Sequence, residues 1–269
     1  MAAQRGRLDA ELVRRKLTAT REAARKVILV GRVRVGGFVA DKPARMVLAT
    51  DSIVLQPDDG VDYVSRGAHK LLGALAEFRG EGLPDVDGRL CLDVGASTGG
   101  FTEVLLNEGA EHVVAVDVGY GQIAWRVRTD PRVTVMERTN ARYLGPDDLP
   151  YTPQLAVIDV SFISLRLILP ALASLMAQDG DILAMVKPQF ELGREAVGKG
   201  GVVRDPAARA LAVASVSASA AGSGLGTRGI VASPLPGPAG NVEYFLWLSP
   251  GGETCSQQDA ESAVRHGPA

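Results

Sequence analysis

Residues 90–106 constrain the fold more than any other part of this 269-residue chain. Leu90-Cys91-Leu92-Asp93-Val94 has the composition of a short buried strand, and a turn rich in glycine and serine follows it. Helical periodicity then resumes through Phe101, Leu105 and Leu106. A strand, a glycine turn and a helix N-terminus in this order predict an α/β sheet with a cofactor-binding crevice at the turn.

The spacing within this segment distinguishes between two classes of cofactor. Dinucleotide-binding turns read G-x-G-x-x-G, whereas this turn reads D-x-G-x-S-x-G-G, with Asp93 ahead of the first glycine. A carboxylate suits an amino group and a sulfonium better than a pyrophosphate, and Asp117 ends the next predicted strand, where it can hold ribose hydroxyls. We therefore expect S-adenosylmethionine rather than NAD, although a glycine-rich turn without a ligand is the plain alternative. The expected cofactor contacts are Asp93, Gly95, Ala96, Ser97, Gly99, Gly100, Phe101, Asp117, Val118, Asn140 and Asp159.

Strands and helices alternate over most of the chain. Further strands are predicted at 113–117, 133–136, 155–159, 181–187 and 241–248. We expect a helix over 165–177, and we interpret 211–226 as the end of a helix plus a loop. The prediction is a doubly wound, Rossmann-like class I methyltransferase sheet over residues 65–249, with a disordered tail at 250–269.

The N-terminal part differs in charge from the rest. Residues 1–50 hold 12 Lys/Arg against 4 Asp/Glu, whereas the remainder holds 17 against 27. A basic head on an acidic body favours a polyanionic partner such as RNA, although a solvated basic face is the alternative. The pattern R-L-D-x-x-L-V…T-R-x-x-A…G-x-V-x-V-G-G…K-P…D-x-I-x-L resembles the S4-like RNA-binding domain, from which Lys16 and Val30 depart slightly. We expect a small α+β S4-like domain at 1–56 and a linker at 57–64. The candidate RNA-binding residues are Arg14, Arg15, Lys16, Arg21, Arg25, Lys26, Arg32, Arg34 and Arg66.

Composition excludes several other classes of protein. Two cysteines and three histidines supply no disulfide framework and no zinc-ligand spacing, so no metal is expected. The longest uncharged apolar window, 167–178, is short and contains Pro170, and the basic N-terminus is not followed by an apolar run. We expect a cytoplasmic protein. The sequence does not determine its oligomeric state, and a monomer is the default expectation.

Polar residues at the ends of the predicted strands indicate the methyl acceptor. The turn Asp159-Val160-Ser161-Phe162 lacks the prolines typical of enzymes that methylate exocyclic amines, and neither cysteine is placed for attack on cytosine carbon-5. An alcohol acceptor needs a general base, and a lysine can serve when it is neutral. Lys187 ends a strand, and Lys70, Asp159 and Glu243 lie near other element ends. Surface ion pairs are the alternative for each residue taken alone.

Several motifs resemble the TlyA (hemolysin A) family, whose catalytic domain is of the FtsJ/RrmJ type. They are Ser65–Lys70, Asp93–Thr102, Val116–Tyr120, Glu137–Asn140, Ile158–Leu165, Val186–Glu191 and Gly240–Glu243, and the resemblance spans about residues 7–248. It implies 2′-O-methylation of cytidine ribose in small- and large-subunit ribosomal RNA, with S-adenosylmethionine as donor. It also implies a catalytic Lys-Asp-Lys-Glu tetrad at Lys70, Asp159, Lys187 and Glu243, and a link between loss of the protein and resistance to capreomycin-type antibiotics.

Three other functions are alternatives, and a sequence feature argues against each. A nicotinamide-dependent dehydrogenase is disfavoured by the glycine spacing. A membrane-active hemolysin is disfavoured because no apolar span or strongly amphipathic basic helix is evident. An RNA-binding protein with an inactive enzyme domain is disfavoured by the complete tetrad.

Overall fold

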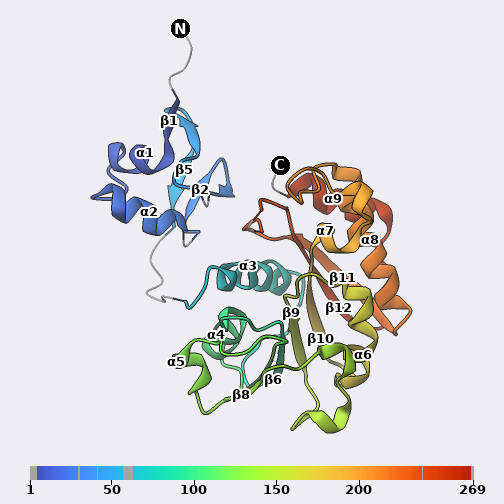
Figure 1. Cartoon of the computed structure of the whole chain (residues 1–269). Helices are drawn as coiled ribbons and strands as arrows, with labels where there is room; N and C mark the ends of the chain where they lie inside the picture. Colours follow the sequence, from blue (N-terminus) through green and yellow to red (C-terminus); the bar gives the residue numbers. More distant parts are fainter. Residues whose placement is uncertain (1–4, 30, 41, 57–62, 238, 268–269) are drawn as a thin grey trace.

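The computed structural model describes residues 5–29, 31–40, 42–56, 63–237 and 239–267, in two parts (Figure 1). Most of the predicted linker, residues 57–62, lies outside the described residues. The N-terminal part packs two helices against short strands. Its elements are β1 (Arg5–Arg7), α1 (Leu8–Arg14), α2 (Arg21–Leu29), β2 (Val33–Val35), β3 (Phe38–Val39), β4 (Met46–Leu48) and β5 (Ile53–Leu55).

The core of this small part follows from helical spacing. Leu8 and Leu12 lie one turn apart on α1, and Ala24 and Ile28 lie one turn apart on α2. All four side chains are buried in one cluster with Val33 and Val47. Strand β1 pairs with β4, and β2 lies between β3 and β5.

The C-terminal part is built on a seven-stranded sheet in the order β11-β12-β10-β9-β6-β7-β8. The pairs among β8, β7, β6, β9 and β10 are parallel, whereas β12 runs antiparallel to both β10 and β11. This topology confirms the predicted doubly wound fold. The strands are β6 (Leu90–Val94), β7 (His112–Val116), β8 (Val133–Met136), β9 (Leu155–Ile158), β10 (Asp181–Val186), β11 (Leu225–Ala232) and β12 (Tyr244–Pro250).

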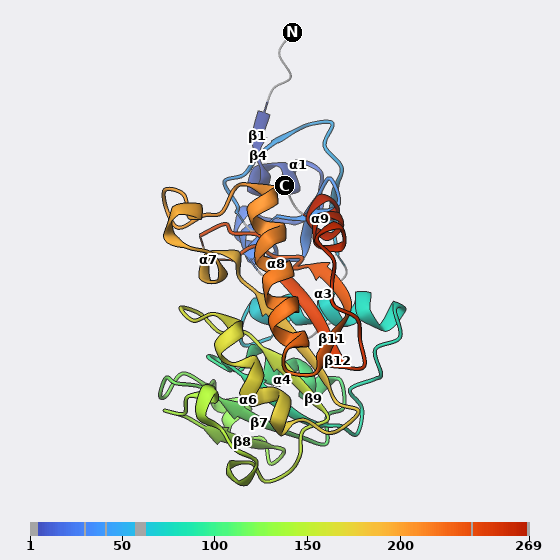
Figure 2. The same cartoon turned by 90° about the vertical axis from the view of Figure 1, so that its right-hand side faces the viewer.

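Helices cover both faces of this sheet, as Figures 1 and 2 show. On one face the sheet packs against α3 (Gly67–Gly80) and α4 (Gly100–Asn107), with α5 (Trp125–Arg128) beside them. On the other face it packs against α6 (Leu169–Leu175) and α8 (Pro206–Ala221). Because β6, β9 and β10 are buried on both faces, their sequences read as continuous apolar runs. The short α7 (Pro188–Glu191) follows β10.

Three expectations need correction. The tail predicted to be disordered contains α9 (Gln257–His266), which Ser256 caps and which buries Ala260 and Val264. The segment read as a loop up to residue 226 already includes the start of β11, which pairs along its length with β12. The long helix expected over 165–177 is a 3-10 turn (Leu165–Leu167) followed by α6, with Pro170 in the first turn of α6. In each case tertiary pairing or a proline overrides the local pattern.

Candidate active site and RNA-binding surface

A cavity of about 550 Å³ opens at the carboxyl ends of β6, β7, β8 and β9. It lies where the strand order reverses between β6 and β9, which is the usual ligand position in such sheets. Its volume is within the range of small-molecule sites. Of the expected cofactor contacts, the cavity wall includes Gly95, Ser97, Asp117, Val118, Asn140 and Asp159.

The turn between β6 and α4 is shaped by close backbone approach. Gly95 has φ +89°, and a Cβ added there would lie 2.4 Å from the carbonyl oxygen of Asp159. Only glycine fits this position, so the two strand ends can approach each other beside the cavity. Ser97, at φ +49°, donates its backbone N–H to Asp117 Oδ2 at 2.8 Å.

The Asp117 carboxylate is fixed from two sides, because Gly119 N–H also donates to Oδ1 at 2.6 Å. A carboxylate has further acceptor sites, and Asp117 lines the cavity, so it can still accept ribose hydroxyls. Val118, Ile163 and Ile168 add apolar walls suited to an adenine ring. These residues fit S-adenosylmethionine in shape and chemistry.

Asp93 does not line the cavity, contrary to expectation. Its side chain is fully buried, with Oδ2 accepting a 2.6 Å hydrogen bond from Thr102 Oγ1. Its other oxygen, Oδ1, is buried and lacks a hydrogen-bond partner among the described residues. Burial raises the pKa of Asp93 to about 7. Asp93 therefore braces the start of α4 beneath the glycine turn.

Four further expected contacts are absent from the cavity wall. Phe101 faces the opposite way, packing on Phe245 with ring centroids 6.1 Å apart, because the inner side of α4 must cover the sheet. Ala96 is buried in the cluster with Val127, and Gly99 adopts φ +93° against the same valine. Gly100 is buried against Ser65. Close spacing along the chain does not bring these residues to the ligand side.

Asp93 gives a prediction for stability against pH. Because its pKa is raised on folding, the folded state binds a proton that the unfolded state has released between about pH 4 and pH 7. The wild type should therefore lose about 1.4 kcal/mol of stability per pH unit relative to Asp93→Asn as the pH rises through that window. Urea unfolding of both proteins from pH 4.5 to 8 checks this. Parallel stability curves would contradict it.

The expected tetrad forms two ion pairs at one end of the sheet. Lys187 Nζ lies 2.5 Å from Asp159 Oδ1, and Lys70 Nζ lies 2.6 Å from Glu243 Oε2. Val186 pairs with Tyr244 across β10 and β12, so Lys187 and Glu243 occupy the same end of the sheet. Lys70 reaches this end from α3, with Nζ 4.0 Å from Met185 Sδ. The structure thus brings the four residues together.

Burial distinguishes this cluster from a surface network. Lys70, Lys187 and Glu243 are 6%, 8% and 1% exposed, while Asp159 reaches the cavity wall. Two cations and two carboxylates leave the cluster without net charge. Lys187 Nζ also donates a 2.9 Å hydrogen bond to Ser161 Oγ, and Ser161 lines the cavity. Lys187 is therefore held by two groups that border the cofactor cavity.

The loop after β9 supplies cavity residues that sequence reasoning did not assign to the site. Phe162 lines the cavity, is 90% exposed and has φ +65°, an unusual conformation for an aromatic residue. Buried Glu191 holds this loop, accepting hydrogen bonds from Ser164 Oγ at 2.6 Å and Leu165 N–H at 2.8 Å. The signal in the sequence was the turn following Asp159. The other unassigned lining residues include Gln122, Thr139, Val160, Ser161, Ile163 and Ile168.

Three of the basic residues in the N-terminal part are held by one buried carboxylate. Asp9 is fully buried, with Oδ2 2.9 Å from Arg7, 3.0 Å from Arg21 and 3.5 Å from Arg25. The Arg7 guanidinium, with Arg21, holds the pKa of Asp9 well below its usual range. The side chains of Arg21 and Arg25 remain exposed. Their guanidinium groups can therefore contact phosphates through the N–H groups that do not face Asp9.

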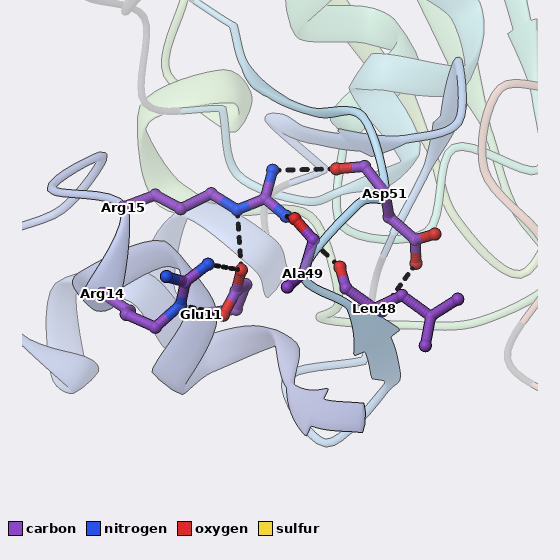
Figure 3. A network of polar contacts seen from close by, with 6 residues as sticks. All are labelled: Glu11, Arg14, Arg15, Leu48, Ala49 and Asp51. Atoms are coloured by element: carbon purple, nitrogen blue, oxygen red, sulfur yellow. Dashed lines mark hydrogen bonds and ion pairs between the residues drawn. The ribbon is translucent and has the colours of Figure 1, made fainter. Parts of the chain in front are cut away.

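Arg14 and Arg15 are adjacent but make different contacts (Figure 3). Both pair with Glu11, whose pKa is lowered to about 2 chiefly by Arg14. Arg15 also donates to the backbone carbonyls of Asp51, Leu48 and Ala49 at 2.8, 3.3 and 2.9 Å. Its guanidinium is thereby used in joining α1 to the β4–β5 turn, which argues against the expected RNA contact. Arg14, by contrast, is exposed.

The remaining basic candidates lie in several places. Lys16 is exposed and has φ +59° at the end of α1. Arg32 donates to the Gln56 carbonyl at 3.0 Å, and Arg34 to the Gly37 carbonyl at 3.0 Å, so both also stabilise local structure. Arg66 is half-buried just before α3, in the C-terminal part. Lys26 belongs to α2, next to Arg25.

Two negative findings apply to the described residues. Within them, His, Cys, Asp and Glu side chains do not gather in groups of three that could hold a metal ion. In the same part of the chain, none of the helices combines the length and the apolar character needed to cross a membrane.

Comparison with known proteins agrees with this geometry. The FtsJ-like methyltransferase family profile matches residues 63–249, and the S4 domain profile matches residues 6–53. The chain is 55% identical to the 16S/23S rRNA (cytidine-2′-O)-methyltransferase TlyA of Mycobacterium tuberculosis over 246 residues, which cover 91% of this chain and 90% of that protein. It is 36% identical to Hemolysin A of Brachyspira hyodysenteriae, covering 89% and 98% of the two chains.

A solved structure supports the same relationship. A Streptococcus thermophilus protein that carries a hemolysin name superposes with a TM-score of 0.73 at 39% identity, covering 98% of this chain and 96% of that one. The match extends over both parts of the molecule. The chain belongs to the TlyA family of FtsJ-like methyltransferases and carries an N-terminal S4 domain.

Proposed function

We propose that this protein transfers the methyl group of S-adenosylmethionine to the ribose 2′-hydroxyl of cytidines in small- and large-subunit ribosomal RNA. The observation that carries the proposal is Lys187, held by Asp159 and Ser161 at the edge of the cofactor cavity and backed by the Lys70–Glu243 pair. The relatives named as rRNA cytidine-2′-O-methyltransferases support the choice of substrate. In this proposal the enzyme acts as a monomer in the cytoplasm, where ribosomal subunits are found.

The proposed division of labour follows the two parts of the chain. Residues 1–56 form the RNA-binding domain, residues 57–64 the linker and residues 65–249 the catalytic domain. Exposed cations such as Arg14, Arg21 and Arg25 bind phosphates and position the RNA without reading its sequence. Arg66, just ahead of α3, is assigned a further RNA contact from the catalytic domain. A cytidine within a duplex would have to be flipped out to reach it.

The chemistry assigned to the protein is proton removal and orientation. When bound, S-adenosylmethionine supplies an electrophilic methyl group whose bond to sulfur breaks, leaving the electron pair on sulfur. Lys187 first releases its ammonium proton to solvent, and the neutral amine then accepts the proton of the ribose hydroxyl as that oxygen bonds to the methyl carbon. Asp159 pairs with the ammonium that results, and Ser161 fixes the direction of Nζ. Asp117, Val118 and Asn140 hold the nucleoside of the cofactor.

The reaction is tested with purified protein, tritiated S-adenosylmethionine and ribosomal subunits from a strain lacking the gene. A 2′-O-methyl group blocks alkaline cleavage of the adjacent phosphodiester, so label should appear in an alkali-resistant dinucleotide with a methylated cytidine. Label only in mononucleotides would mean base methylation and would refute the tetrad assignment. No label on either subunit or on the assembled ribosome would favour an RNA-binding protein without activity.

A further inference from the structure

The segment that joins β11 to β12, described at residues 233–237 and 239–243, contacts the S4 domain through Leu235. Leu235 is only 2% exposed, and a Cβ added at Gly31 would lie 3.2 Å from Leu235 Cδ2. Gly31 has φ +80° and follows α2, so the leucine packs directly on the backbone of the S4 domain. In Figure 1 this segment reaches from the catalytic sheet toward α2 and β2. It is therefore a physical connection between the two parts.

The same segment is folded tightly onto Glu243. Ser233 N–H donates to the Glu243 carbonyl at 2.8 Å, and Gly237 N–H donates to the Asn241 carbonyl at 2.9 Å. A Cβ added at Gly237 would lie 2.5 Å from Glu243 Oε1. The carboxylate thus rests against the turn that also contains Leu235, and a shift of this turn would move it.

The partner of Glu243 is tied to the segment as well. A Cβ added at Gly73 would lie 2.6 Å from Pro234 Cγ, so Pro234 packs closely on α3. Gly73 lies about one helical turn beyond Lys70, which forms the 2.6 Å ion pair with Glu243. Pro234 and Leu235 therefore connect the S4 domain to both members of that ion pair.

We propose that Leu235 is a positioning residue through which the seating of the S4 domain sets the geometry of the Lys70–Glu243 pair. This inference rests on the proposed function, because it concerns the same tetrad. When RNA fixes the S4 domain, the domain holds Leu235, and the segment holds Glu243 and Lys70 in place behind Lys187. A displacement of about 1 Å at a reacting centre can cost about 100-fold in rate, so such a contact can govern turnover.

The test compares Leu235→Ala and Leu235→Met in the full-length protein. With subunits and S-adenosylmethionine both saturating, Leu235→Ala should lower kcat about tenfold. It should change the KM for subunits and the Kd for S-adenosylmethionine by less than about twofold. Leu235→Met, which nearly preserves volume, should restore most of the rate. Leu149→Ala is the matched control, because it truncates a buried leucine in the core on the α6 and α8 face.

Three results would overturn the inference. If Leu235→Ala raises KM and leaves kcat intact, the leucine serves only RNA binding. If Leu149→Ala lowers kcat equally, the effect is general destabilisation. Hydrogen exchange gives a readout independent of activity: peptides covering 233–243 and the first turns of α3 should exchange faster in Leu235→Ala, and no change there would also refute it. Failure of the wild type to label ribose would instead refute the proposed function.

Discussion

Replacing Lys187 with alanine is expected to lower methyl transfer about 1,000-fold at saturating substrates, because it removes the general base that receives the ribose proton. The Kd for S-adenosylmethionine should stay nearly unchanged, since Lys187 lies outside the residues that line the cofactor cavity. Single-turnover assays of ribose labelling with wild-type and variant proteins measure the loss. Isothermal titration with S-adenosylmethionine verifies that the binding site is intact.

Lys187→Arg separates proton removal from electrostatic stabilisation. Arginine keeps a cation that can pair with Asp159, but a guanidinium does not release its proton under assay conditions. If Lys187 acts as the base, the arginine variant should be as inactive as the alanine variant. Retention of more than about a tenth of the wild-type rate would mean that the positive charge, rather than proton transfer, supports the reaction.

The second large effect is expected at Asp9, which is buried beneath Arg7, Arg21 and Arg25. Asp9→Asn removes the charge that these partly exposed guanidinium groups share. Losing hydrogen bonds to a charged group costs up to about 3 kcal/mol. Hydrogen exchange in α1 and α2 should therefore become about 100-fold faster, while β6 and β10 should exchange as in the wild type. RNA binding should weaken along with the S4 domain.

The exposed Glu22→Gln is the control for Asp9→Asn, because it removes one negative charge from the same domain. The pKa of Asp9 is lowered on folding, so its contribution is present above about pH 4 and fades as the pH falls below that value. The two variants should accordingly differ strongly at pH 7 and less at pH 3. Equal exchange rates at pH 7 would show that Asp9 is not a stabilising centre.

The sequence predicts the sheet well, because its parallel strands are buried on both faces and therefore have strong local patterns. β6, β7, β9 and β10 were found from apolar runs alone. β11 was missed because an edge strand in an Ala/Ser/Gly-rich region depends on pairing with β12. The tail helix α9 was not predicted because it also depends on tertiary contacts: it is stabilised by burying Ala260 and Val264.

The candidate site was predicted unevenly. Strand ends meet at one edge of the sheet, so the sequence alone places Asp159, Lys187 and Glu243 near one another. The direction of each side chain was harder to predict. Phe101 lies at the start of α4, beside the predicted glycine turn, but its ring packs on Phe245 in the core. The RNA-binding residues of the N-terminal part could not be identified by counting cations. Such a count does not reveal that Asp9 and Glu11 lie buried among the arginines, or that Arg15 donates to three backbone carbonyls.

The place of β12 in the sheet has a consequence for biosynthesis. Glu243 stands just before this strand, which is inserted between β10 and β11 although it follows both in the chain. The cavity walls and three tetrad residues are therefore synthesised well before the fourth can join them. A nascent chain that already exposes its S4 domain can meet RNA while it still lacks a complete tetrad. The chain can therefore become active only after most of it has been synthesised. A chain truncated before residue 243 should bind RNA without modifying it.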